Sequence, residues 1–255
     1  MAREASKTRK LWTSETTALL RGRGIDIGCG DDPVAPDAVR FDRQDGDAQD
    51  VSRYVSERFD YVFASHVLEH VTDPRSALAS WFALLKPGGH LFVLVPDEDL
   101  YELGHFPSLF NDDHKWTFTI HKNRSWSPAS HNVLDLARSL PGEIVSLELH
   151  DHGYDRRLAR HTPGRWALWL FTLYTHVSKK IRSATARRRI GLALNLVGMP
   201  IDQTTFPDDR MAQIQLIVRK PVDGLKGDDN QLGLGDRRSS KQSAATAAES
   251  GGSSK

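Results

Sequence analysis

The stretch RGIDIGCGDDP, residues 23–33, decides the fold of this 255-residue chain. Two isoleucines precede a Gly-Cys-Gly turn, and three aspartates surround that turn. A glycine turn directly after a short strand is typical of nucleotide-binding folds, because glycine allows the backbone to approach a ligand closely. The aspartates make this turn acidic, so the stretch predicts a ligand that differs from most nucleotides.

Apolar runs of strand length alternate with helical patterns along the chain. The expected strands are 24–28, 38–42, 59–65, 90–96, 143–149 and 212–220. A helix is expected to begin at Asp73, a good N-cap followed by Pro74, and to stop at the KPGG sequence of 86–89. This alternation predicts an α/β fold, namely a doubly wound, Rossmann-like, seven-stranded and mostly parallel sheet with helices on both faces.

The carboxyl ends of four expected strands carry polar residues. These ends are Asp26–Gly30, Asp42, Ser65–His70 and Pro96–Asp99. Ligands of open α/β sheets bind beyond the carboxyl ends of the strands. Four strand ends that are far apart in the sequence are therefore expected to meet around one crevice.

The acidic turn excludes the commonest nucleotide ligands. Pro33 occupies the third glycine position of the dinucleotide fingerprint G-x-G-x-x-G, and Asp31 and Asp32 would repel a pyrophosphate, as would Asp26. No Gly-Lys-Ser/Thr follows, which excludes a P-loop. The ligand should carry positive charge near the turn and no phosphate. S-adenosylmethionine, with its sulfonium and α-amine, fits this description, and Asp42 is suited to accept hydrogen bonds from its ribose hydroxyls.

Five segments, in order and at family spacing, resemble class I S-adenosylmethionine-dependent methyltransferases of the small-molecule, type 11-like group. They are IDIGCG (25–30), FD (41–42), DGDAQDV (45–51), FDYVFASHVLEHVTDP (59–74) and LLKPGGHLFVLVPD (84–97). The resemblance covers residues 24–97 well and extends loosely to residue 220. It implies an enzyme that transfers a methyl group from S-adenosylmethionine.

The resemblance also implies which residues bind this cofactor. They are Asp26, Gly28, Cys29, Gly30, Asp42, Asp47, Ala48, Ser65 and His66. The turn would hold the methionine part, Asp42 the ribose and residues 47–48 the adenine, while residues 65–66 would flank the methyl-transfer crevice. Cys29 is interpreted as a small residue packed under the cofactor rather than as a redox centre. Only about a dozen residues separate Gly30 from Asp42, so the first crossover helix should be very short or absent.

Histidines are the candidates for removing a proton from an acceptor hydroxyl. The set comprises His66, His70, His114 and His121. We favour His114, in the lid-like loop 97–119, as the base or as a substrate ligand, with Asp113 orienting it. The alternative is that His114 and Asp113 belong to a purely structural turn. His70, in the LEH motif, is the second catalytic candidate, against a role in ordering its loop. No metal is predicted, because the DDH sequence near His121 lacks a tight ligand spacing; a divalent cation there is the lesser alternative.

The composition divides the chain into regions. Residues 1–10 are expected to be a flexible N-terminus, 11–221 the methyltransferase domain with a helical insertion near 155–205, and 222–255 a disordered tail rich in Gly, Ser and Ala. An aromatic run followed by a basic stretch occupies 165–190. That pattern fits a helical cap over the site or, alternatively, an interfacial helix resting on anionic lipid. No specific nucleic-acid partner is expected, because the aromatics do not interleave with the basic residues.

The predicted function is methylation of oxygen on a small molecule or a sugar or glycan acceptor. The alternative is a non-catalytic scaffold or regulator that binds S-adenosylmethionine, and a nicotinamide-dependent oxidoreductase is more remote. A single cysteine favours a cytoplasmic location, with peripheral contact at the inner membrane surface as a further alternative. The net charge of +1 gives no overall field that would attract nucleic acid or an acidic partner. The sequence does not indicate an oligomeric state.

Overall fold

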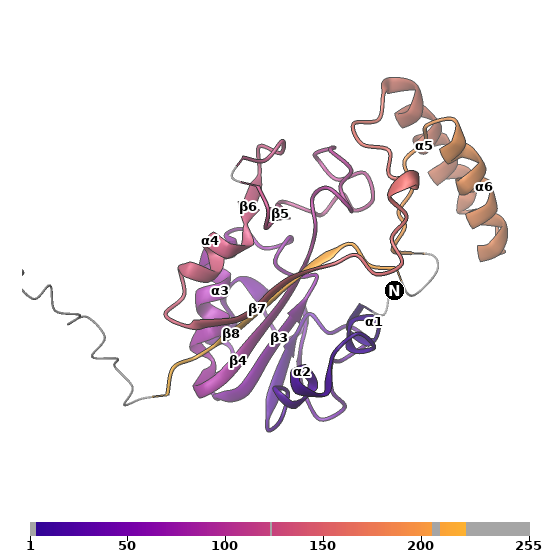
Figure 1. Ribbon diagram of the computed structural model, residues 1–255. Helices are drawn as coiled ribbons and strands as arrows, with labels where there is room; N and C mark the ends of the chain where they lie inside the picture. Colours follow the sequence, from indigo (N-terminus) through magenta and orange to yellow (C-terminus); the bar gives the residue numbers. More distant parts are fainter. Residues whose placement is uncertain (1–3, 123, 206–209, 223–255) are drawn as a thin grey trace, which may run out of the picture. The chain divides into compact units, whose positions relative to one another are not determined.

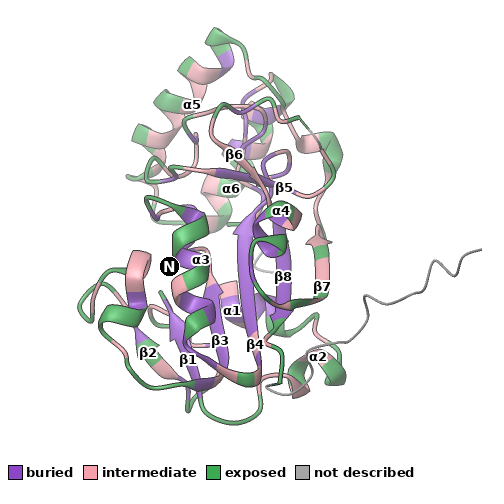
Figure 2. Ribbon diagram, turned by 90° about the vertical axis from the view of Figure 1, so that its left-hand side faces the viewer, coloured by how far each residue is buried: buried purple, intermediate pink, exposed green. Residues whose placement is uncertain are grey.

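The computed structural model describes residues 4–122, 124–205 and 210–222. The strands of its large sheet are β1 (Gly24–Ile27), β2 (Val39–Phe41), β3 (Phe59–Ser65), β4 (Leu85–Pro96), β7 (Glu143–His150) and β8 (Gln213–Arg219). Figure 1 shows the sheet between its helices, and Figure 2 labels its strands in their order β2-β1-β3-β4-β8-β7. A second, small sheet pairs β5 (Thr117–Thr119) with β6 (Ser130–Asn132).

The large sheet is mixed but mostly parallel. β1 pairs in parallel with β2 and β3, and β3 pairs in parallel with β4. β8 runs antiparallel between β4 and β7. The α/β, Rossmann-like fold is confirmed, but within the described residues the sheet has six strands rather than the predicted seven. These six strands correspond to the six apolar runs of the sequence, and no further run was available for a seventh. The segment 42–58 contains the 3₁₀ helix η1 (Ala48–Arg53), which the Asp47 side chain caps.

Helices cover both faces of the sheet, as expected. α3 (Pro74–Ala83) and α4 (Val133–Arg138) pack on one face, and Trp81 of α3 is completely buried there. α1 (Glu4–Arg9) and the segment around α2 (Ser14–Ala18) cover the other face. The strands β1, β3, β4 and β8 are buried along most of their length, whereas the edge strand β7 is partly exposed (Figure 2). Burial of each large apolar side chain contributes roughly 1.5–3 kcal/mol to folding, which fixes the sheet that carries the site.

Helix α3 begins as predicted and ends earlier than predicted. The Asp73 side chain accepts a hydrogen bond from Arg75 N at 3.0 Å, and Pro74 occupies the first turn. The helix stops at Ala83, and the KPGG sequence lies inside β4 instead of following the helix. The reason is strand pairing, because Leu85 already pairs with Phe59 of β3.

All residues of the connection between β1 and β2 are described, and none of them lies in a helix. This agrees with the prediction from the short distance in sequence between Gly30 and Asp42. The Asp26 carboxylate accepts a hydrogen bond from Val34 N at 2.6 Å. This bond folds the connection back against the end of β1 and so replaces the packing that a crossover helix would supply.

The prediction of a flexible segment at 1–10 differs from the structure, in which residues 4–9 form α1. Ser6 N donates to Asp32 Oδ2 at 2.9 Å, and Thr8 Oγ1 accepts from Gln213 Nε2 at 2.7 Å. These bonds join α1 to residues far away in the sequence. Local composition does not report such contacts, which is why the helix was not predicted.

The region expected as a helical insertion contains η2 (Arg156–Leu158), α5 (Arg165–Ser178) and α6 (Ala184–Leu196). The Tyr174 hydroxyl of α5 donates to Arg187 O of α6 at 2.9 Å, and the two helices lie side by side (Figure 1). Among the described helices, none is long and apolar enough to cross a membrane. The predicted tail lies outside the described residues from 223 onward, and the proposed domain boundaries stay predictions.

Candidate active site

The glycine turn after β1 adopts a backbone conformation that favours glycine. Gly28 has φ +72° and Gly30 has φ +52°. Gly28 N donates to Phe41 O at 2.7 Å, which joins the turn to the end of β2. A Cβ atom on Gly28 would lie 2.4 Å from Val67 Cγ2, so a side chain at this position has no room. The turn is therefore held close to both neighbouring strands.

The aspartates around the turn have separate tasks. Asp42 lies at the end of β2, and its Oδ2 accepts from Gly30 N at 2.9 Å while Oδ1 accepts from Arg43 N at 2.8 Å. Asp26 is almost completely buried, and this burial raises its pKa to about 7, against the opposing effect of the bond from Val34 N. Near neutral pH, the negative charge at the turn therefore comes mainly from the other aspartates.

Two adjoining cavities lie at the carboxyl ends of β1, β2 and β3. The larger measures about 750 Å³ and is lined by Gly28, Phe41, Asp42, Arg43, Gly46, Asp47, Ala48, Tyr54, His66, Val67, His70, Val71, Asp113 and Lys115. The smaller measures about 390 Å³ and is lined by Glu4, Ala5, Asp26, Gly28, Cys29, Gly30, Asp31, Asp32, Phe63, Ser65 and His66. The nine predicted cofactor residues thus lie around two cavities that share Gly28 and His66. Their roles remain predictions.

Sequence reasoning missed several residues of the larger cavity. Tyr54 forms part of its wall and packs against Phe41 with ring centroids 6.0 Å apart. No local pattern distinguishes Tyr54 from any other exposed tyrosine. Asp47, which was predicted, lines the cavity but also caps η1 by accepting from Gln49 N at 2.9 Å.

Cys29 fits the packing interpretation better than the redox one. Its thiol is partly buried, and this burial raises its pKa. A reactive cysteine needs a lowered pKa, because the thiolate is the nucleophile.

The fourth expected strand end, Pro96–Asp99, does not line these two cavities. Asp97 accepts hydrogen bonds from Asp99 N and Leu100 N, both at 3.0 Å, within its own turn. Glu98 is buried and accepts from the hydroxyls of Ser125 and Ser130 at 2.7 and 2.6 Å. These acids hold the loop that follows β4 in place, so the expectation that all four ends line one crevice is corrected.

His66 connects the two cavities and has an unusual backbone conformation, with φ +55°. Its Nδ1 lies 3.3 Å from Glu69 Oε1, and its Nε2 lies 3.0 Å from Gln213 Oε1. Burial disfavours the protonated ring, but the close approach of Glu69 and its negative charge outweigh this effect and raise the pKa of His66 to about 9. His66 is therefore a cation at neutral pH rather than a base.

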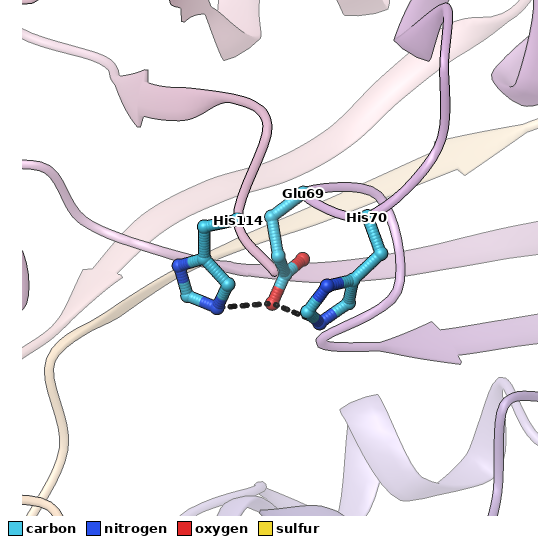
Figure 3. Close-up of side chains that lie close together, drawn as sticks. All are labelled: Glu69, His70 and His114. Atoms are coloured by element: carbon cyan, nitrogen blue, oxygen red, sulfur yellow. Dashed lines mark ion pairs between the residues drawn. The ribbon is translucent and has the colours of Figure 1, made fainter. Parts of the chain in front are cut away.

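Glu69 is completely buried and lies between histidines from two different loops. Its Oε1 is 4.0 Å from His70 Nε2 and 3.9 Å from His114 Nε2 (Figure 3). Burial opposes the ionisation of Glu69, but the neighbouring histidines, His66 first among them, hold its pKa below the ordinary value. The candidates His70 and His114 are thus brought together, with ring centroids 5.0 Å apart.

Each of these two histidines has its own partner at Nδ1. His114 Nδ1 lies 2.7 Å from Oε1 of the buried Glu102. His70 Nδ1 lies 3.1 Å from Asp113 O and 3.3 Å from Asp113 Oδ2. The expectation that Asp113 orients His114 is therefore wrong. The Asp113 side chain is half-exposed and turns toward His70, whereas His114 points inward to an acid that sequence reasoning did not single out.

A third cavity, of about 300 Å³, adjoins this cluster. It is lined by Glu4, His66, Glu69, His70, Tyr101, Phe110, Asn111, His114, Asp202, Thr204, Thr205, Ala212 and Gln213. It shares His66 and His70 with the largest cavity. His121, the fourth candidate base, is exposed and does not line it.

Comparison with known proteins agrees with this geometry. The methyltransferase domain family matches residues 5–186, well over half of the chain. The chain therefore belongs to the S-adenosylmethionine-dependent methyltransferases, and S-adenosylmethionine is the cofactor. A cavity of about 750 Å³ with acidic and glycine residues suits such a cofactor in size and charge.

Curated relatives and solved structures resemble the chain more distantly. Ubiquinone biosynthesis O-methyltransferase of Pseudomonas savastanoi is 30% identical over 86 residues, which are 31% of this chain and 37% of that protein. The enzyme of Pseudomonas putida is 25% identical over 117 residues, 35% of this chain and 50% of that protein. The chain thus spans half or less of the length of these relatives. A putative methyltransferase of Bacillus halodurans is 14% identical, with a TM-score of 0.44, covering 82% of this chain and all (100%) of that one. Likeness at that level bears on no functional detail.

Proposed function

We propose that the protein transfers a methyl group from S-adenosylmethionine to a hydroxyl oxygen of a small molecule or a sugar or glycan. One observation carries the proposal. The cavity suited to the cofactor and the 300 Å³ cavity share His66 and His70, so the two ligands would meet beside an imidazole and carboxylate cluster. Methyl transfer from a sulfonium mainly needs alignment of donor and acceptor, which two adjoining cavities supply.

The nine predicted cofactor residues would bind S-adenosylmethionine across the two larger cavities. The acidic turn suits the amine and sulfonium of its methionine part, and Asp42 would accept hydrogen bonds from the ribose. Residues 47–48 would contact the adenine. His66, a cation, would interact better with the carboxylate of the methionine part than with the sulfonium.

The 300 Å³ cavity would bind the acceptor. Its wall combines the aromatic rings of Tyr101 and Phe110 with polar side chains that include Asn111, Thr204 and Gln213. Such a lining favours a molecule that has several hydroxyls and one apolar face. A hydroxyl must lose its proton during methylation, and the adjacent His70 and His114 are the proposed groups that assist this loss.

Methyl-labelled S-adenosylmethionine tests this proposal. The full-length protein is incubated with it and with a panel of phenols, sugars and sugar nucleotides, and label in each product is measured with S-adenosylhomocysteine release. Label on an acceptor oxygen is expected. Transfer to nitrogen or carbon alone would contradict the acceptor class. Binding of S-adenosylhomocysteine without transfer to any acceptor would favour the scaffold alternative.

Contact with a membrane surface is a further part of the proposal, alongside a cytoplasmic location. Four apolar residues of α5 recur at helical spacing and are about half exposed or more: Trp166, Trp169, Leu173 and Val177. Basic residues follow at 179–182. An apolar stripe beside positive charge suits anionic lipid. Sedimentation with phosphatidylglycerol vesicles tests this: Trp166→Ala with Trp169→Ala should reduce binding, and equal binding would leave α5 as a cap over the site.

A further inference from the structure

Glu69 is a buried carboxylate without a hydrogen-bond partner. The residue is 0% exposed, and within the described part of the chain neither of its side-chain oxygens accepts a hydrogen bond. Burying an ionised carboxylate is costly unless a cation or hydrogen-bond donors compensate its charge. His66 compensates part of it from one side, at 3.3 Å. His70 and His114 face the same oxygen, Oε1, at 4.0 and 3.9 Å.

The partners at Nδ1 decide what these two rings offer to Glu69. Asp113 O is a carbonyl and can only accept, so His70 Nδ1 donates to it. His114 Nδ1 likewise donates to the Glu102 carboxylate at 2.7 Å. Each Nδ1 thus has a partner of its own, and each Nε2 is the ring nitrogen that faces Glu69. Two imidazole nitrogens and one carboxylate oxygen are therefore gathered within 4.8 Å of one another.

We propose that Glu69, His70 and His114 bind a divalent transition-metal ion such as Zn²⁺ or Fe²⁺. Two imidazole nitrogens and one carboxylate oxygen are a ligand set typical of these ions, and a carboxylate or carbonyl bound at the opposite nitrogen commonly orients such histidines. The ligand atoms lie within 4.8 Å of one another. Tetrahedral ligands at about 2.1 Å from one ion lie about 3.4 Å apart, so side-chain rotations that move the ligand atoms by about 0.5–1.5 Å close the site.

The position of this site connects it to the cavities. All three ligands line the 300 Å³ cavity, and His70 also lines the largest one. The remaining coordination positions are thus available to water or to an oxygen of a bound acceptor. Ion binding goes beyond the proposed function and does not depend on it. The use of the ion to lower the pKa of a coordinated hydroxyl does rest on that function.

This metal site could not be predicted from the sequence. His70 and His114 are separated by more than forty residues, and the sequence spacing that signals a metal site is absent. The DDH sequence near His121, the cation site considered from sequence, contributes His114 alone. Glu69 is the residue before His70 in the LEH motif, and that adjacency was the available signal.

Cobalt and zinc titrations test the site in the full-length protein. Chelator-treated protein is titrated with Co²⁺, followed by visible absorption, and with Zn²⁺ in a calorimeter. We expect one ion per chain and a ligand-field spectrum of Co²⁺ with nitrogen ligands. His70→Gln and Glu69→Gln should each weaken binding at least tenfold. His176→Gln, which removes an exposed imidazole of α5, is the matched control and should bind like the unaltered protein.

A second variant separates ligation from folding. Glu102→Gln keeps the shape of the side chain that orients His114, and it should weaken ion binding about 10–100-fold with circular dichroism unchanged. Absence of stoichiometric binding, or equal affinity in His70→Gln and the control, overturns the inference. S-adenosylhomocysteine binding and methyl transfer are measured on the same samples. Methyl transfer without ion binding would refute the metal site alone, and ion binding without methyl transfer would count against the proposed function alone.

Discussion

Replacing Asp42 with alanine is expected to weaken the binding of S-adenosylhomocysteine about tenfold to a hundredfold. The Asp42 carboxylate lines the largest cavity and already accepts from Gly30 N and Arg43 N, at 2.9 and 2.8 Å. A carboxylate offers about four lone-pair sites, so about two remain for the ribose hydroxyls. The alanine variant loses these sites and also releases one end of the glycine turn.

The magnitude follows from the bonds that are lost. A hydrogen bond to a charged group contributes roughly 1.5–3 kcal/mol, and each 1.4 kcal/mol corresponds to about a tenfold change in affinity. The loss of one such bond to the ribose therefore weakens binding about tenfold or somewhat more. The altered geometry of the glycine turn weakens binding further.

Isothermal titration calorimetry with S-adenosylhomocysteine measures this change. Asp37→Ala is the matched control, because Asp37 is an exposed acid of the same β1–β2 connection and lines neither cofactor cavity. The control should bind with unchanged affinity. An Asp42→Ala protein that binds within about twofold of the unaltered protein would remove Asp42 from the cofactor site.

Three further outcomes are expected. Gly28→Ala should lower the free energy of unfolding, measured in urea, by about 2–4 kcal/mol, because Gly28 has a positive φ and an added Cβ would collide with Val67. Gly164→Ala is the control: Gly164 faces open space, so this change should cost less than about 1 kcal/mol. Equal costs would refute this interpretation of the turn. Asp26 has a pKa of about 7 in the folded protein, above its ordinary 3.8, so its contribution to stability is present at low pH and is lost as the pH rises toward 7. Between pH 3.8 and pH 7, the stability of Asp26→Asn should therefore rise relative to the unaltered protein by up to about 4 kcal/mol. A stability difference that does not change with pH would contradict the raised pKa. His114→Gln should reduce methyl transfer about 10²–10⁴-fold with the affinity for S-adenosylhomocysteine unchanged; near-normal transfer would make this histidine structural.

The parts of the fold that follow from short-range rules could be predicted from the sequence. The acidic glycine turn, the cap at Asp73 and the absence of a helix between β1 and β2 each depend on fewer than about a dozen neighbouring residues. The seventh predicted strand had no apolar run of its own among the six runs of strand length, and the described residues form six strands in the large sheet.

The candidate site was predicted less completely, because burial decides it. His70 and His114 were identified as histidines in suggestive loops, but Glu69 and Glu102 give them their orientation. A glutamate in a sequence has the same appearance whether it is exposed or buried. The end of the lid is joined to the loop after β3, where Lys115 N donates to Glu69 O at 2.8 Å, and such a contact is a long-range property of the chain.

The helix α1 has a consequence for the order in which the site is completed during synthesis. Glu4 and Ala5 line the smaller cofactor cavity, and Thr8 is held by Gln213 at the start of β8, about two hundred residues later in translation. Trp12 Nε1 donates to Gln215 Oε1 at 2.5 Å in the same strand. Asp32 can hold Ser6 early in synthesis, but α1 has its full set of anchors only after the ribosome has released β8. A nascent chain therefore has the glycine turn before this wall of the pocket is fully fixed, so the cofactor stabilises the finished domain more than its growing precursor.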